Sequence, residues 1–323
     1  MKKLFAFLLL ISISILLFSC NKLEITTCNP IYAMDTVINF KFYNVNDYKT
    51  HYDKLVSIYR KYDSLCDDFN HHDGFNNVYD LNESRSIEAS SELIEILTLA
   101  NELKEKTNGY FNPLVGRLSK LWKEDITNYN EKKIDSLTID SNLIESELEI
   151  INSSSIIIDG NKVSIIGKAN IDLGAIAKGF ATKKCVEYLM DNNIDGYLIN
   201  AGESSVALGS KASKAFKVVL EAPYSSGSIK TLDLLNTSVA SSSGKYQNEL
   251  INNVRYHHII NPYTGYPSNI YDNVNVIIND SLLADCYSTA LFSMDLNTAK
   301  KFIEENDIKA ILYKDDKIIY EKI

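Results

Sequence analysis

The sequence lacks both a basic charge excess and the short motifs that mark several large protein classes. A net charge of -9 and a pI near 5.2 leave no basic surface to neutralise phosphates, so we expect no nucleic acid partner. Serines are plentiful, but there is no G-x-S-x-G nucleophile elbow. There is also no Walker loop and no G-x-G-x-x-G, which disfavours the nucleotide folds that depend on those two motifs. An anionic ligand would have to be held locally, by a helix N-terminus, a lysine or a metal ion.

Cysteine is scarce and scattered. Five cysteines occur in the chain, with no C-x-x-C pair and no histidine at zinc spacing, which argues against a metal-thiolate site. Cys28, Cys66, Cys185 and Cys286 form an even set, which permits disulfides without establishing any. Cys185 and Cys286 fall in helical patterns with apolar neighbours, so we expect these two to be buried free thiols.

The first 20 residues have the layout of an export signal. Two lysines precede an unbroken apolar run that stops at Ser19-Cys20, and this end resembles the lipobox of bacterial lipoproteins. We therefore expect residues 1–19 to be a signal peptide, Cys20 to carry the lipid anchor, and residues 20–30 to be a polar tether. The protein would then be a cell-membrane lipoprotein facing the periplasm or the extracellular side. Phe18 is bulkier than this motif usually carries, so an ordinary cleaved signal and an uncleaved anchor remain alternatives.

The remaining chain, residues 31–323, reads as one domain of the α+β class. An apolar content of 45% is ample for a core, and strand and helix patterns mix without a regular βαβ rhythm, a repeat or a dividing linker. The patterns predict one strand over residues 31–43, a long surface loop over residues 69–86, and a turn over residues 241–244.

Two segments could carry chemistry. The stretch Asp172–Gly179 puts small residues beside a lone acid and a lone lysine, which suits either close approach of a ligand to the backbone or a tightly packed strand-to-helix corner. Further on, Asp285 and Thr289 are four residues apart and share one face of a predicted helix. Their oxygens suit Mg²⁺. The alternative is that Asp285 favours the helix dipole and Thr289 bonds back to a carbonyl.

Three further segments are ambiguous on their own. His257 and His258 precede a turn and point to opposite sides of an extended chain, so one of them could be a base, or both could be surface residues without a role. Ser242–Gly244 could contact a phosphate or be an ordinary loop. Tyr110–Asn112 could offer an aromatic face to a ring or belong to the core.

The order of these segments resembles the ApbE-like flavin transferases, which are FAD:protein FMN transferases and often bacterial lipoproteins. The runs D-L-G-A-I-A-K-G and A-D-x-x-x-T are the specific ones. The resemblance covers almost the whole mature chain, in the stretches Ala33–Thr36, Phe111–Gly116, Asp172–Gly179, Asn200–Gly202, Ser242–Gly244, His258–Gly265 and Ala284–Ala290.

The resemblance implies a fold and a set of site residues. The fold would be a compact single-domain α/β prism with mixed or antiparallel sheets and packed helices. Mg²⁺ would be held by the carbonyl of Ala175 and the side chains of Asp285 and Thr289, and His258 would be the general base. FAD contacts would fall on Met34, His72, Tyr110, Phe111, Asn112, Asp172, Lys178, His258 and Ile259. The sequence departs from the family pattern at Asn112, Lys183, Glu203 and Lys245. These departures affect positions expected to contact the cofactor more than they affect the expected metal ligands Asp285 and Thr289.

The implied reaction is Mg²⁺-dependent cleavage of FAD as substrate. FMN would be attached through a phosphoester to a threonine or serine of an exported acceptor protein, with release of AMP. One alternative is a FAD pyrophosphatase, in which water replaces the acceptor hydroxyl. Another alternative is a non-catalytic flavin-binding or solute-binding lipoprotein.

Overall fold

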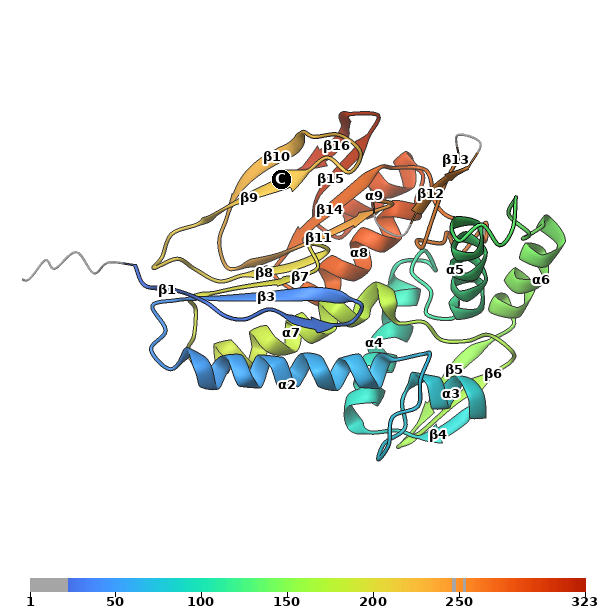
Figure 1. Ribbon diagram of the computed structural model, residues 1–323, viewed down its shortest axis with the longest axis horizontal. Coiled ribbons are helices and arrows are strands. Elements are labelled where there is room, and N and C mark those ends of the chain that lie inside the picture. The colour runs from blue at the N-terminus through green and yellow to red at the C-terminus, as the bar shows by residue number, and fades with distance from the viewer. Residues whose placement is uncertain (1–22, 246–247, 252–253) are drawn as a thin grey trace, which may run out of the picture.

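The computed structural model describes residues 23–245, 248–251 and 254–323 (Figure 1). The predicted signal peptide and Cys20 lie outside these ranges. No helix within them is long and apolar enough to cross a membrane. The four cysteines that the ranges contain are free, and Cys185 and Cys286 are buried, as the sequence predicted.

A single antiparallel sheet runs through the middle of the molecule. Within the described residues it has nine strands, in the order β1-β3-β7-β8-β11-β14-β15-β16, with β2 paired to β3. Along β3, Ile38, Phe40 and Phe42 are buried and alternate with more exposed residues, as expected for a strand whose two faces differ. The bounds are β1 Ile25–Thr27, β2 Ile31–Ala33, β3 Thr36–Tyr43, β7 Tyr197–Ala201, β8 Ser205–Leu208, β11 Thr237–Ser243, β14 Asn273–Ile278, β15 Lys309–Lys314 and β16 Lys317–Lys322.

Three helices cover one face of this sheet, as Figure 1 shows for α2 (Tyr48–Cys66) and α7 (Gly174–Asp191) beneath the strands. The ring of Phe40 on β3 packs edge-on against Tyr59 of α2, with ring centroids 5.8 Å apart. The third helix, α8 (Ser281–Ser293), is buried along most of its length between α7 and strands β11 and β14. The helix α9 (Leu296–Glu305) follows it and leads into β15.

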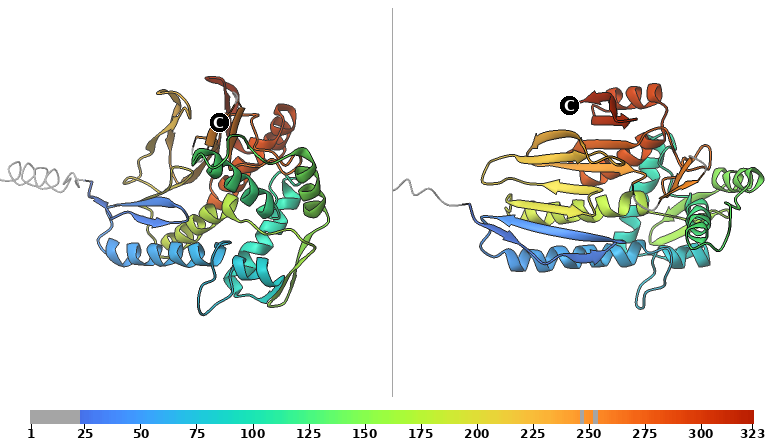
Figure 2. Two further views of the ribbon diagram at one scale, coloured as in Figure 1. Left: turned by 45° about the vertical axis from the view of Figure 1, so that its right-hand side comes forward. Right: turned by 45° about the horizontal axis from the view of Figure 1, so that its top comes forward.

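The opposite face is covered in part by a hairpin of β9 (Phe216–Glu221) and β10 (Ser228–Leu234), seen as a separate layer in Figure 2. Its inward residues Leu220 and Leu232 form an apolar cluster with Val239, Ile277 and Ile311 of β11, β14 and β15. The sheet is therefore enclosed by helices on one side and by this hairpin on the other.

The remaining elements form a lobe at one end of the sheet. Asn82 joins this lobe to the central helices, because its side chain exchanges two hydrogen bonds with the backbone of Ile171, at 2.9 and 2.7 Å. Ile171 lies three residues before α7, so the lobe positions the start of that helix. The lobe contains α3 Val78–Ser84, α4 Ser91–Lys106, α5 Gly116–Asn130, α6 Ser141–Asn152, β4 Ser86–Glu88, β5 Ser155–Asp159, β6 Lys162–Ile166, β12 Asn248–Ile251 and β13 Val254–His257.

The expectation of one strand over residues 31–43 was wrong. The segment is a hairpin, because Met34 and Asp35 both take left-handed conformations, with φ of 54° and 56°, and reverse the chain between β2 and β3. The Met34 N–H donates to Oδ1 of Asp63 at 2.6 Å, so α2 stabilises a turn that the alternating pattern did not reveal.

Two other local expectations also needed correction. The loop over residues 69–86 contains the short helix α3, which begins with a capping box between Asn77 and Asp80. The turn over residues 241–244 is mostly strand, since β11 extends to Ser243 and is paired with β8 on one side and β14 on the other. The register with β8 ends at Ala240, so the three serines that follow pair with β14, which holds a serine-rich segment in a strand that it does not favour by itself.

Candidate active site in the central cleft

A cleft of about 1280 Å³ lies where the sheet, the central helices and the lobe meet. Its walls come from the β2–β3 turn, the end of α2, the segment before α5, the start of α7, strands β7 to β9 and β11, the segment after β13, and α8. Of the predicted site residues, His72 alone is not among those lining the cleft. The lining includes Met34, Tyr110, Phe111, Asn112, Asp172, Ala175, Lys178, His258, Ile259, Asp285 and Thr289.

Asp285 belongs to α8 and lies at the base of the cleft, where α8 packs against α7. Its side chain is 5% exposed, and Oδ2 accepts a hydrogen bond of 2.7 Å from the N–H of Gly179 on α7. A Cβ added to Gly179 would come within 2.5 Å of Asp285 Cβ, so only glycine permits this approach. Burial raises the pKa of Asp285 to about 6, while the Lys178 charge and the Gly179 hydrogen bond act in the opposite direction.

The carbonyl of Ala175 belongs to the same turn. In an α-helix the carbonyl of residue i points toward the N–H of residue i+4, which for Ala175 is Gly179. Since Asp285 Oδ2 is bonded to that N–H, the carboxylate lies beside this turn of α7. The family resemblance implied that Ala175 and Asp285, which are far apart in the sequence, contribute to one metal site. The structure places their two segments side by side.

A chain of hydroxyls orients Thr289. Ser288 donates its proton to the carbonyl of Asp285 at 2.9 Å, and Ser242 Oγ lies 2.9 Å from Ser288 Oγ and 3.4 Å from Thr289 Oγ1. Because Ser288 has only one proton, Ser242 must donate to Ser288, which leaves Thr289 to donate to Ser242. The lone pairs of Thr289 then remain available to a cation in the cleft.

The N-terminus of α7 opens into the cleft. Gly174 and Ala175 both line it, and Oδ1 of Asp172 accepts a hydrogen bond of 2.7 Å from the Gly174 N–H. Lys178 lies one turn further, with Nζ 3.3 Å from the carbonyl of Gly174. The helix dipole and this ammonium group together make the wall favourable for an anion.

The two histidines have different environments. His257 is 1% exposed; its Nε2 donates to the carbonyl of Ser268 at 2.8 Å, and its Nδ1 accepts from the N–H of Ile259 at 3.2 Å. Burial lowers the pKa of His257 to about 4. His258 is exposed and lines the cleft. His257 is therefore a neutral packing residue, and His258 is the histidine that faces the cleft.

The aromatic segment before α5 is only partly open to the cleft. Phe111 is 2% exposed and Asn112 is 9% exposed, with Asn112 Oδ1 accepting from the N–H of Leu114 at 3.0 Å. Tyr110 is less buried and stands against Tyr263, with ring centroids 4.8 Å apart. Asn112 therefore acts first as a capping group for the turn that leads into α5.

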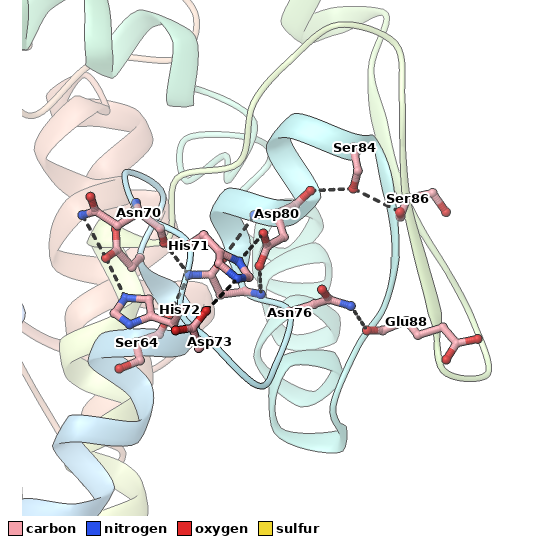
Figure 3. Close-up of polar contacts among 12 residues, drawn as sticks. Ser64, Asn70, His71, His72, Asp73, Asn76, Asp80, Ser84, Ser86 and Glu88 are labelled. Atoms are coloured by element: carbon pink, nitrogen blue, oxygen red, sulfur yellow. Dashed lines mark hydrogen bonds and ion pairs between the residues drawn. The ribbon is translucent and has the colours of Figure 1, made fainter.

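His72 lies in the loop between α2 and α3, which Figure 3 shows with its polar contacts. Its Nε2 lies 2.9 Å from Oδ2 of Asp67, and its ring is stacked on Phe75. Asp67 lines the cleft and also accepts hydrogen bonds from the N–H groups of Phe69 and Asn70, at 2.8 and 3.0 Å. The structure thus places His72 behind the cleft wall, where it contacts Asp67.

Several residues that line the cleft were not predicted from the sequence. Asp68 follows α2 and lines the cleft, and its pKa is raised to about 7 by burial and then by the charge of Asp172. Phe69 next to it is 48% exposed, with Lys123 Nζ 4.5 Å from its ring centroid. The strand β9 was also missed as a cleft wall. The acid pair Asp67-Asp68 directly after an amphipathic helix was the signal available in the sequence.

Curated proteins are similar to this chain over most of its length. The chain is 27% identical over 245 residues to the FAD:protein FMN transferase of Klebsiella pneumoniae, covering 72% of this chain and 73% of that one. An FAD:protein FMN transferase of Buchnera aphidicola is 25% identical over 298 residues, covering 88% of this chain and 85% of that one.

Solved structures share the fold. The ApbE protein of Thermotoga maritima superposes with a TM-score of 0.78 at 24% identity, covering 90% of this chain and 94% of that chain. The flavin transferase ApbE of Vibrio cholerae gives 0.73 at 22% identity with the same coverage. These likenesses confirm the predicted ApbE-like α+β fold. The sequence model of the ApbE family matches residues 34–312, and the chain belongs to that family.

Proposed function

We propose that this protein is an FAD:protein FMN transferase that requires Mg²⁺. The observation that carries the proposal is the convergence of Asp285, Thr289 and the N-terminus of α7 at the base of one cleft. Small-molecule pockets typically measure roughly 300–1,000 Å³, so a cleft of about 1280 Å³ has room for a dinucleotide as large as FAD. The names of the curated relatives support the same activity.

The donor set at the base of the cleft fits Mg²⁺. Among the described residues, a hydrogen-bond donor contacts only Oδ2 of the Asp285 carboxylate. The Thr289 hydroxyl and the Ala175 carbonyl contribute two further hard oxygen ligands. No group of three or more His, Cys, Asp or Glu side chains in the described ranges could hold a metal. With a single carboxylate, the site suits an ion that keeps waters and substrate phosphate oxygens as its other ligands. When bound, Mg²⁺ would offset charge on the pyrophosphate.

The residues of the cleft have distinct roles in the proposed reaction. The N-terminus of α7 and Lys178 bind the pyrophosphate, and His258 accepts the proton of the acceptor hydroxyl. The hydroxyl oxygen forms a bond to the phosphorus on the FMN side, and the bond from that phosphorus to the bridging oxygen breaks. AMP leaves with the bridging oxygen, and FMN remains attached to the serine or threonine as a phosphoester. Met34, Tyr110 and the Ile259 segment would hold the rest of FAD.

The proposed cellular setting follows from the N-terminal segment. Lipidation at Cys20 would place the enzyme on the outer face of a cell membrane, where exported acceptor proteins emerge. Labelling with radioactive palmitate in cells, compared with a Cys20→Ala variant, tests the anchor. Equal labelling of both proteins would rule it out.

The activity is tested with purified protein, FAD, MgCl₂ and exported proteins of the same cells. We expect a flavin-labelled acceptor in mass spectrometry and AMP in equal amount. Asp285→Ala should abolish both, whereas Asp135→Ala, which removes an exposed carboxylate in the α5–α6 connection, should change neither. Undiminished labelling by Asp285→Ala would contradict the metal assignment.

The alternatives give different products. A pyrophosphatase releases FMN and AMP at the same rate with or without an acceptor. A flavin-binding protein retains intact FAD and releases no AMP. Quantifying AMP, free FMN and labelled protein in one reaction therefore separates the three functions.

A further inference from the structure

The strand β9 presents an open edge to the cleft. It is paired with β10 on one side, and no other described strand pairs with it. All six of its residues, Phe216 to Glu221, line the cleft. Successive side chains of a strand point to opposite faces, so a strand lines a cavity with both sets only when its edge faces that cavity. Along this edge, backbone N–H and C=O groups are available to a further strand.

The sheet face next to this edge forms a partly apolar floor. Val37 of β3, Leu198 of β7 and Val206 of β8 all line the cleft on the face opposite the helices, and none of them is fully buried. Val37 is 49% exposed. Asn39 and Asn200 lie among them and also line the cleft. Leu198 and Val206 are half-buried because they also pack against the apolar cluster of Tyr43, Leu208 and Phe216. The floor therefore offers shallow apolar contacts beside β9, with polar groups between them.

Both ends of β9 are fixed, and one end lies close to the reaction centre. At its start, the ring of Phe216 packs edge-on against Tyr43, with centroids 5.3 Å apart. At its end, Glu221 accepts a hydrogen bond of 3.2 Å from Lys245, the residue after Gly244. A Cβ on Gly244 would come within 2.5 Å of the His257 ring, so this end of β9 is near the His257-His258 pair.

The loop after β9 is tied to the same place. The guanidinium of Arg255 on β13 lies 3.8 Å from the ring centroid of Tyr224. The Tyr224 hydroxyl lies close to Gly244, since a Cβ built on this glycine would be only 2.7 Å from the hydroxyl oxygen. These contacts place the loop after β9 beside Gly244, the residue that packs against the His257 ring.

We propose that the open edge of β9 is the docking site for an extended segment of the acceptor protein. The segment adds to the β9–β10 hairpin as a third strand, with alternate side chains on the floor of Val37, Leu198 and Val206, and carries its serine or threonine toward His258. This inference rests on the proposed transferase function, which requires a polypeptide hydroxyl to enter the cleft.

The position of the other candidate contacts favours this occupant. Met34, Tyr110 and Lys178, where FAD contacts are expected, lie on walls formed by the β2–β3 turn, the segment before α5 and α7. The β9 edge is a separate wall of the same cleft. Main-chain hydrogen bonds give affinity that depends little on which side chains the bound segment carries. The six residues of β9 span about 20 Å, which is enough to fix the register of the segment and so the position of one residue at the reaction centre.

The test uses a synthetic peptide of about twelve residues centred on the residue that the labelling experiment identifies. Peptides with a single N-methylated amide at successive positions are compared by their KM for flavin transfer. N-methylation removes one donor, and the amides of a paired strand point alternately toward and away from the partner. We expect KM to rise about tenfold or more at every second position and to change less than about threefold between them, with kcat and FAD binding unchanged.

Each other outcome has a definite meaning. Equal effects at all positions, or none at any position, would overturn the docking mode. Labelling of the whole acceptor protein but not of the peptide would also overturn it, because recognition would then need a folded surface. Failure to label either one, with FAD and Mg²⁺ present, would remove the transferase function itself and this inference with it.

Hydrogen exchange gives a second readout on the enzyme. The probe is the same peptide with its reactive residue replaced by alanine, so that no transfer occurs. Amides of β9 should exchange more slowly when the peptide is bound. The edge strand β16 is the matched control, since its outer edge is also unpaired among the described strands and should show no change. Unchanged exchange in β9 at saturating peptide would contradict the proposal.

Discussion

At the scale of single residues, the adjacent histidines show how environment separates two identical side chains. His258 is exposed in the cleft, so its substitution should leave the fold intact while removing the proposed base. We expect His258→Ala to lower the rate of flavin transfer by about 10²–10⁴-fold, the usual contribution of a general base. Single-turnover labelling at saturating FAD measures the rate, and the melting temperature checks the fold. A variant with wild-type transfer would exclude His258 from catalysis.

His257 should instead contribute to the dependence of stability on pH. Its pKa is lowered from 6.5 to about 4, so between these values the unfolded chain binds a proton that the folded protein does not. The contribution of His257 to stability is therefore complete above pH 6.5 and is lost as the pH drops toward 4, by about 3 kcal/mol in total at 1.36 kcal/mol per unit. Asp68 and Asp285, whose pKa values are raised, act in the opposite direction, so the effect of His257 is measured by difference. From pH 7 to pH 4.5 the change in the free energy of unfolding by urea should be more negative in the wild type and in His258→Gln than in His257→Gln.

At the scale of elements, the contact between α7 and α8 determines whether the site forms. A Cβ on Gly179 would lie 2.5 Å from both Asp285 Cβ and the Ser281 carbonyl, so Gly179→Ala must push the helices apart. Overpacking of this kind costs about 1–3 kcal/mol, and it should also displace Asp285. We expect a lower melting temperature and a loss of transfer activity. Gly227→Ala is the control, because its new Cβ would meet nothing closer than Ser225 Oγ at 3.9 Å.

The same elements show what the sequence could and could not predict. The helices α7 and α8 were predicted because the helical spacing of apolar residues around Cys185 and Cys286 is a local signal. The turn at Met34-Asp35 was not, because a long-range bond from Asp63 supports two residues with positive φ. The strand β11 was missed because its serines take their conformation from β8 and β14, which are distant in the chain.

At the scale of the whole molecule, the cleft is a product of the complete fold. Its lining runs from Met34 to Thr289, and the strand β11 lies between β8 and β14 only after the chain has crossed the sheet several times. The relation of β9 to the site could not be predicted from sequence for this reason. The packing of the hairpin on the second face of the sheet depends on Val239, Ile277 and Ile311 from three other strands.

Because residues from both halves of the chain line the cleft, binding there should stabilise the protein as a unit. A ligand at a concentration one hundred times its Kd adds about 2.7 kcal/mol to the free energy of unfolding. We expect FAD to raise the melting temperature and MgCl₂ to raise it further only when FAD is present, since phosphate oxygens complete the coordination of the ion. In Asp285→Asn the FAD effect should persist and the extra Mg²⁺ effect should vanish. An equal Mg²⁺ effect in both proteins would place the ion elsewhere, and NaCl at the same ionic strength controls for general salt effects.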